Sequence, residues 1–278
     1  MKPLSMWEYS FILKEAQVLV GNYLKKIYQL DKSKFSFDFG KKSLIVNLGK
    51  NFYLASKNYE VRQEPSAFVM LLRKHLKSKK LLNISQIGND RYYALDFEGG
   101  YRVILKQFAK GNLILLENDI VVAFFYNEEG IQKAKVFQVP PSEEPDKIFY
   151  FGKKYHFLEP QQIIEKNIDN FFVYDGEVYL VLAKDFDIQK AKSFPTFSQA
   201  LEFLDIQLQQ KDKEQNLVQL KKLEHRLSSQ LHSLAAINKK IDYLKRTIDY
   251  IKQNIDLLNN KLEEAKSDGK KTLKLKIP

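Results

Sequence analysis

The sequence predicts an α+β protein in which a β-rich head, sandwich-like or barrel-like and flanked by helices, precedes one long helical coiled-coil arm. Between residues 35 and 139, short strand-like runs follow one another with turn residues between them, a pattern typical of antiparallel sheets. Aromatic residues, which favour strands, make up 13% of the chain. From residue 220 onward, apolar residues recur at alternating spacings of three and four, which indicates a coiled coil.

Composition excludes several classes of site. The chain of 278 residues has no cysteine, which excludes disulfides, cysteine-ligated zinc and a thiol nucleophile. Its 4 histidines are scattered, and no zinc-protease, phosphate-loop, dinucleotide-binding or serine-hydrolase motif is present. We therefore expect a non-enzymatic protein with no metal site, no catalytic residues and no cofactor.

The net charge of +11 and the pI near 9.4 favour a polyanionic partner, either nucleic acid or anionic lipid. Residues 211–278 hold 16 Lys+Arg and 9 Asp+Glu, a net of +7, which leaves +4 for the first 210 residues. The N-terminus has no apolar signal-peptide region, and no run approaches the roughly 18 apolar residues of a membrane span. We expect a cytoplasmic protein without a membrane segment.

The head, residues 1–139, is predicted to begin with a helix over residues 10–28. A hairpin follows at 35–39 and 42–48 around the turn residue Gly40, with a third strand at 52–54. A short helix is expected at 64–76, with Pro65 in its first turn. Further strands are expected at 81–87, 91–97, 101–107, 112–116, 120–126 and 135–139.

Residues 140–195 are predicted to be a linker and a small appendage. The linker begins at the paired prolines Pro140 and Pro141, which do not fit inside an element. The appendage has strand-like runs at 171–174 and 178–182. From residue 196 the chain becomes helical, with Thr196 or Ser198 as its N-cap.

The arm, residues 196–269, carries a regular apolar seam. A helix cannot bury such a stripe alone, and no second long helix is present, so we expect a partner helix in another molecule. The polar Gln230 either sets the register of pairing or marks local fraying. The helix is expected to end at Gly269, with 270–278 as a short strand or tail. The seam consists of Leu220, Leu223, Leu227, Gln230, Leu234, Ile237, Ile241, Leu244, Ile248, Ile251, Ile255, Leu258 and Leu262.

Three stretches together are similar to the N-terminal domain of the NFACT family, proteins of ribosome quality control. They are Pro65-Ser-Ala-Phe-Val-Met-Leu-Leu-Arg-Lys-His-Leu76, Ile84-Ser-Gln-Ile-Gly-Asn-Asp-Arg91 and Phe108-Ala-Lys-Gly-Asn-Leu-Ile-Leu115. The resemblance implies a head similar to the N-terminal domain of DNA glycosylases. It also implies a C-terminal domain and a returning helix after the coil, which this sequence lacks, so we expect either that a separate polypeptide supplies them or that they have been removed from the chain. The partner helix of the arm is expected to come from that polypeptide or from a second copy of this chain. In two places the chain departs from the family pattern: Lys106 stands where an acidic residue is usual, and residues 140–170 are too few for the expected helix-hairpin-helix module.

The resemblance implies binding to a stalled large ribosomal subunit and to tRNA. It ties Asp90 and Arg91 to tRNA engagement and singles out Gly111 and Asn112. The residues by themselves indicate a basic cluster for phosphate contacts, the alternative being a solvated helix end. This cluster consists of Arg73, Lys74, Lys77, Lys79 and Lys80.

Two other functions compete with this one. A DNA glycosylase with lyase activity is implied by the shared fold, but those enzymes expose a proline at the mature N-terminus, whereas here Lys2 precedes Pro3. A coiled-coil scaffold or membrane-surface adaptor would leave the Asp90-Arg91 and Gly111-Asn112 pairs without a role. Binding to acidic liposomes as tight as binding to ribosomes would favour the adaptor.

Overall fold

The computed structural model describes residues 3–55, 59, 64–139, 150–155, 168–183 and 186–269. The chain divides into two compact units, Met1–Leu208 and Gln209–Pro278, called here the first and second units. The long helix α5 (Phe197–Gln253) begins in the first unit and continues in the second, which also holds α6 (Ile255–Ser267). The expected α+β class is confirmed. The predicted domain boundaries at 139/140 and 195/196 stay predictions.

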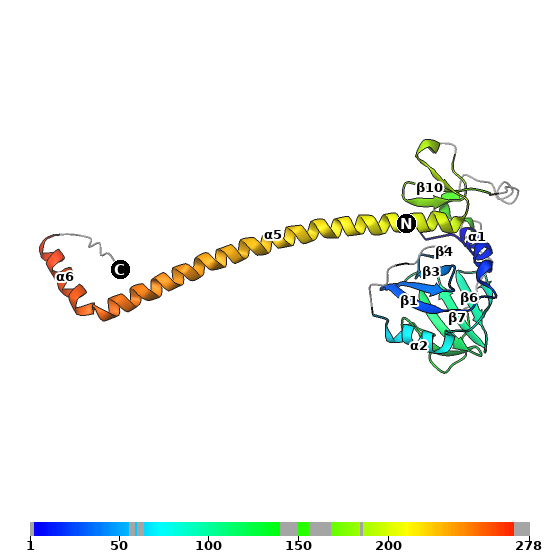
Figure 1. Ribbon diagram of the computed structural model, residues 1–278, viewed down its shortest axis with the longest axis horizontal. Helices are drawn as coiled ribbons and strands as arrows, with labels where there is room; N and C mark the ends of the chain where they lie inside the picture. Colours follow the sequence, from blue (N-terminus) through cyan, green and yellow to red (C-terminus); the bar gives the residue numbers. More distant parts are fainter. Residues whose placement is uncertain are drawn as a thin grey trace. The chain divides into compact units, whose positions relative to one another are not determined.

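In its described residues the first unit has three antiparallel sheets, and in the two larger ones consecutive strands are neighbours, so each is a meander of hairpins (Figure 1). The first sheet consists of β1 (Lys26–Asp31), β2 (Lys34–Asp38), β3 (Ser43–Asn47) and β4 (Asn51–Ala55). The second consists of β5 (Leu81–Ile87), β6 (Tyr92–Phe97), β7 (Tyr101–Lys106), β8 (Asn112–Glu117) and β9 (Ile120–Phe124). The third has the order β11 (Glu177–Tyr179), β10 (Phe171–Tyr174) and β12 (Lys192–Phe194).

The main core lies between the first two sheets. The rings of Phe52 and Tyr93 meet at 5.0 Å between centroids, and those of Phe35 and Phe125 meet at 4.9 Å. Strand β6 alternates between this core and a second apolar cluster, to which Tyr92 belongs. Because successive side chains of a strand point to opposite faces, both faces of the second sheet are buried. The expected strands at 35–39, 42–48, 52–54, 81–87, 91–97, 101–107, 112–116, 120–126 and 171–174 are confirmed within one or two residues.

The N-terminal helix differs from the prediction. Helix α1 spans Met6–Ala16 and is followed by a 3-10 turn, η1 (Gln17–Leu19). Ser5 and Glu8 form a reciprocal capping box, which fixes the start four residues earlier than expected. Gly21, at φ +87°, turns the chain away, and 26–31 is a strand, so the helix predicted over 10–28 was wrong in its second half.

Two further predictions are corrected. Helix α2 spans Ala67–Leu76 with Ser66 as its N-cap, so Pro65 precedes the helix instead of lying in its first turn. Residues 135–139 do not form a strand, because a single bridge joins Val136 to Ile120 and the rest is irregular. The run expected at 178–182 is strand only as far as Tyr179.

The third sheet and the start of α5 belong to the core of the first unit. Phe197, at 0% exposure, contacts the ring of Phe171 at 5.6 Å between centroids. Glu15 of α1 accepts hydrogen bonds from the backbone N–H groups of Phe197 (2.7 Å) and Ser198 (2.9 Å), so it caps α5 with a negative charge. Thr196 also caps the helix, as predicted, through a hydrogen bond from the Gln199 N–H at 3.2 Å.

The predicted long helix is confirmed but is not continuous. It is interrupted at Asn254, whose side-chain amide donates to the Tyr250 carbonyl at 3.0 Å and whose φ is −118°. Asparagine competes for backbone hydrogen bonds in this way, and α6 restarts at Ile255. The end of α6 at Ser267, followed by Gly269 at φ +70°, agrees with the expected stop.

Some predictions concern residues outside the described part of the chain. They include the paired prolines, the rest of the predicted linker up to Pro145, and the strand or tail at 270–278. In the described segments, no helix is both long and apolar enough to cross a membrane.

Candidate nucleic-acid interface

A basic hollow of about 460 Å³ lies where α2 packs beside β1. Five of its lining residues are lysine or arginine, and none is acidic. Two lysines come from the start of β1 and the residue before it, and three cations come from the end of α2. The lining residues are Leu24, Lys25, Lys26, Ile27, Met70, Arg73, Lys74 and Lys77.

Arg73 links α2 to β1 across the hollow. Its Nε donates to the Ile27 carbonyl at 2.7 Å. Its guanidinium lies 5.8 Å from the centre of the Tyr28 ring, and the Lys26 ammonium lies 4.9 Å from the same ring. A half-buried aromatic ring close to two cations combines stacking surface with positive charge, which is the combination that single-stranded nucleic acid binds.

The remaining cations are held by local backbone geometry. Lys74 and Lys77 are exposed at the last turn and C-cap of α2, where the helix carbonyls favour positive charge. The Lys25 ammonium lies against Gly40, so close that a Cβ there would come within 2.6 Å of it. Gly40 therefore leaves room for Lys25 at the rim.

The structure does not bring Lys79 and Lys80 into this hollow. The Lys79 ammonium lies 4.7 Å from the centre of the Tyr101 ring, and the Tyr101 hydroxyl donates to Glu117 at 2.7 Å. The Lys80 N–H donates to Glu98 at 3.2 Å. The predicted basic cluster therefore divides: Arg73, Lys74 and Lys77 line the hollow, whereas Lys79 and Lys80 lie outside it.

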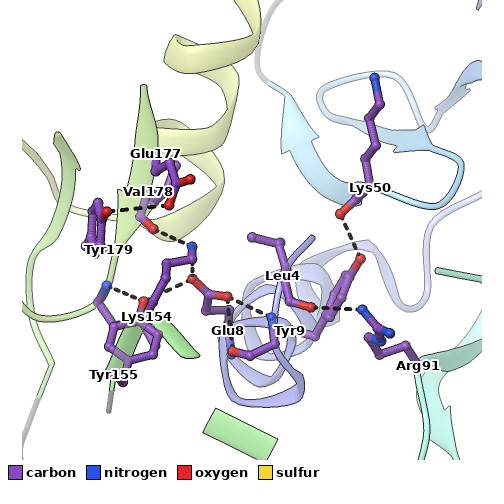
Figure 2. A network of polar contacts seen from close by, with 12 residues as sticks. Leu4, Glu8, Tyr9, Lys50, Arg91, Lys154, Tyr155, Glu177, Val178 and Tyr179 are labelled. Atoms are coloured by element: carbon purple, nitrogen blue, oxygen red, sulfur yellow. Dashed lines mark hydrogen bonds and ion pairs between the residues drawn. The ribbon is translucent and has the colours of Figure 1, made fainter. Parts of the chain in front are cut away.

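Asp90 and Arg91 lie in the turn between β5 and β6. The Asp90 carboxylate accepts from the Arg91 N–H at 2.6 Å, and Gln86 donates to the Asp90 carbonyl at 3.0 Å. The Arg91 guanidinium points towards the segment just before α1, where it donates to the Leu4 carbonyl at 3.5 Å (Figure 2). Burial raises the pKa of the Tyr9 hydroxyl, and the positive charge of Arg91 partly offsets that rise.

Gly111 and Asn112 are buried and connect neighbouring backbone segments. Asn112 has 0% exposure, and its amide bonds the backbone of Tyr126 through both ends, at 2.9 Å each. Gly111, at φ +70°, approaches the backbone of Gly49 so closely that a Cβ would come within 2.1 Å. The Gly-Asn pair thus joins two hairpin turns and the end of the second sheet, so neither residue offers a surface to a ligand.

Lys106, the departure from the family pattern, pairs with Glu128 and lies 4.5 Å from the centre of the Phe108 ring. Glu128 also accepts from Asn112 at 3.3 Å. The unusual positive charge therefore has its own carboxylate partner.

Sequence reasoning missed a buried polar network between α1 and the third sheet (Figure 2). The carboxylate of Glu8, at 0% exposure, accepts from Lys154 at 2.7 Å and from the Tyr155 hydroxyl at 2.9 Å. Lys154 also donates to the Val178 carbonyl, and the Tyr155 hydroxyl accepts from the Leu180 N–H. The capping-box spacing of Ser5 and Glu8 was visible in the sequence and could have located Glu8 at the start of α1. It carries no information about Lys154 and Tyr155.

Lys25 and Lys26 were also missed as interface residues, although two adjacent lysines before a strand are visible in the sequence. Among the residues that the structure describes, no group of three ligating side chains could hold a metal ion.

Comparison with known proteins agrees with this fold. The sequence model described as NFACT N-terminal and middle domains matches residues 11–175. The archaeal Rqc2 homolog aRqcH of Methanocaldococcus jannaschii is 32% identical over 150 residues, covering 48% of this chain and 22% of that protein. Ribosome quality control complex subunit 2 of Saccharomyces cerevisiae is 36% identical over 110 residues, covering 37% of this chain and 11% of that protein.

The ribosome quality control complex subunit NEMF homolog of Drosophila melanogaster is 33% identical over 119 residues, covering 40% of this chain and 12% of that protein. The chain thus spans less than a quarter of the length of each of these relatives.

Two solved structures share the fold. The N-terminal part of the fibronectin/fibrinogen-binding protein from Streptococcus suis has a TM-score of 0.59 at 14% identity, covering 72% of this chain and 98% of that one. The fibrinogen binding protein from Staphylococcus aureus has a TM-score of 0.56 at 15% identity, covering 71% and 97%. Because the family's sequence model matches more than half of the residues, this chain belongs to the NFACT family.

Proposed function

We propose that this chain is a non-catalytic, RNA-binding subunit of ribosome quality control in the cytoplasm, which binds the large ribosomal subunit and tRNA. The relatives named as ribosome quality control complex subunits support the process. The basic hollow supports the mode of binding, because five cations and no acid line it, which suits a phosphate backbone. Two of these cations, Lys26 and Arg73, also lie close to the Tyr28 ring. We also propose that the arm pairs with a helix supplied by another polypeptide.

The proposed interface consists of Lys25, Lys26, Arg73, Lys74 and Lys77, with Tyr28 as its aromatic surface. Lys79 and Lys80 would lie beside it and contribute less, since Glu98 and Glu117 are near them. Asp90 and Arg91 remain in the proposal as residues that the resemblance ties to tRNA. Arg91 would act there by holding the β5–β6 turn against α1. Gly111 and Asn112 are left out of the interface, because they are buried.

Salt-dependent binding of the full chain to tRNA and to purified large subunits tests the interface. We expect Lys26→Ala/Lys74→Ala/Lys77→Ala to weaken both interactions and to lower the slope of log K against log salt by roughly two. All three side chains are exposed, so the fold is retained. Lys32→Ala/Lys133→Ala/Lys135→Ala removes the same charge from other exposed positions and serves as the control. Equal weakening by both triple variants would contradict the assignment of the hollow.

The variant Arg91→Ala tests the role of Arg91 separately from the role of the hollow. We expect weaker tRNA association, accompanied by a lower stability of the first unit, because the contact with Leu4 is lost. Unchanged tRNA binding in Arg91→Ala would remove Arg91 from the proposal and leave the hollow intact.

A further inference from the structure

The part of α5 beyond Leu208, called here the outer stretch (209–253), carries an uncovered apolar seam. Nine apolar seam residues of this stretch are between 42% and 59% exposed in the structure. Gln230, the polar residue of the seam, is exposed as well. The nine residues are Leu220, Leu223, Leu227, Leu234, Ile237, Ile241, Leu244, Ile248 and Ile251.

Most of the charged residues that border the seam are lysine or arginine. In a heptad repeat with Leu220 at position a, the e and g positions lie beside the seam and face the partner helix. Of the charged residues there, Glu224 is the single acid. On the outer stretch, the cations are Arg226, Lys240, Lys245 and Lys252.

The other acids between Leu220 and Gln253 are on another side of the helix. Asp242 and Asp249 both occupy position b, which does not contact a partner in a two-stranded coil. They therefore do not neutralise the cations at the seam.

We propose that the occupant of this seam is an amphipathic helix of another protein whose own seam-flanking positions are acidic. A second copy of this chain fits poorly. In a parallel pair Lys240 would face Lys245, and in an antiparallel pair the flanking cations would again face one another, with Glu224 as the sole opposite charge. Like charges at these positions weaken pairing and select against the wrong partner. This inference rests on the part of the proposed function that gives the arm a partner helix, and it is independent of the RNA interface.

Two synthetic peptides of about four heptads test the proposal. Both carry the same apolar a and d residues, with glutamate at e and g in one and lysine at e and g in the other. We expect the full chain to bind the glutamate peptide at least tenfold more tightly in fluorescence anisotropy, and the preference to weaken as salt is raised.

The chain offers a closely matched pair of variants. Lys240→Glu/Lys245→Glu changes flanking positions, whereas Lys239→Glu/Arg246→Glu changes their sequence neighbours, which occupy the outer position f. We expect the first variant to abolish or reverse the preference for the glutamate peptide and the second to keep it. Ile241→Asn, in the middle of the seam, is expected to abolish binding of both peptides.

Three results would overturn the inference. One is equal binding of the two peptides by the unmodified chain, and another is an equal loss in both charge variants, which would indicate general attraction. The third is a stable dimer of the chain in sedimentation equilibrium that neither peptide disrupts, which would make a second copy the occupant. Because no ribosome or RNA is present, failure of the RNA interface leaves these readouts unchanged.

Discussion

One helix of this protein has two different environments along its length. The helix base, Phe197–Leu208, is capped by Glu15 of α1 and buries Phe197, Ala200, Leu201 and Leu204 in the first unit. The outer stretch of the same helix has a more regular apolar pattern, yet its seam residues are exposed. The difference shows that apolar periodicity makes a helix able to pack, whereas the elements that surround it determine whether it does.

Alkaline pH should cause the largest loss of stability, and the loss should be confined to the first unit. Burial raises the pKa of the Tyr92 hydroxyl to about 12 and raises those of Tyr53, Tyr93 and Tyr155 well above their usual value. An unfolded tyrosine loses its proton near pH 10. Stability is therefore complete below pH 10 and falls as the pH rises towards the folded pKa.

The first unit is expected to unfold by about pH 12, as followed by the emission of its single tryptophan, Trp7. Tyr93→Phe provides the control, because the Tyr93 hydroxyl has no hydrogen-bond partner among the described residues. The variant should lose stability less steeply with pH. A pH profile identical to that of the unmodified chain would contradict the role given to the buried tyrosines.

Phe197→Ala should destabilise the first unit by about 4 kcal/mol, because it removes a fully buried aromatic ring and leaves a cavity. The matched variant on the outer stretch is Leu227→Ala, where the side chain is 57% exposed. Urea unfolding followed by Trp7 emission should detect the first change and not the second. Similar midpoints for the two variants would refute the contrast between helix base and outer stretch.

Lys154→Met should cost about 3 kcal/mol, because it leaves the carboxylate of Glu8 buried without its cation. The second unit offers a comparison in the Lys266–Glu263 pair, whose side chains are 68% and 73% exposed. Lys266→Met is expected to leave the unfolding midpoint unchanged. Both are measured by urea titration, and a Lys154→Met protein as stable as the parent would show that the network is dispensable.

Glu15→Ala should have the smallest of these effects, about 1 kcal/mol, through the loss of the carboxylate that caps α5. Glu214→Ala, at an exposed position of the outer stretch, is the control. Thermal unfolding of the first unit should be lowered by Glu15→Ala alone. The absence of a shift would mean that Thr196 suffices as a cap.

Much of the fold could be predicted from the residues. The strands between 35 and 126 follow from two-residue alternation bounded by turn residues, and both signals are local. The N-terminal helix was misplaced because the spacing of the apolar residues Tyr23, Leu24 and Ile27 is compatible with the continuation of a helix. The conformation of this segment is determined by hydrogen bonds to residues far along the chain. For example, the Leu24 N–H donates to the Lys79 carbonyl at 2.9 Å.

The candidate site was predicted in part. Arg73, Lys74 and Lys77 are close in sequence, so one helix end brings them together. Lys25 and Lys26 join them only because α2 packs against β1, and Lys79 and Lys80 leave the group because the chain reverses at Ser78, whose φ is +62°. Gly111 and Asn112 were singled out by a sequence motif, but a motif does not distinguish a ligand-binding residue from one that stabilises a turn. In the structure both residues have turn-stabilising contacts.

By itself the sequence determined the composition-level facts: a basic chain, strands followed by a long helix, and a heptad seam with cationic flanks. These depend on residue type and spacing along one element. Only the tertiary structure decided which part of α5 is buried, which lysines share a hollow, and that Glu8, Lys154 and Tyr155 meet in the interior. Such contacts join residues that are distant in the sequence, 146 positions apart in the case of Glu8 and Lys154, and no local pattern encodes which distant partner a side chain meets.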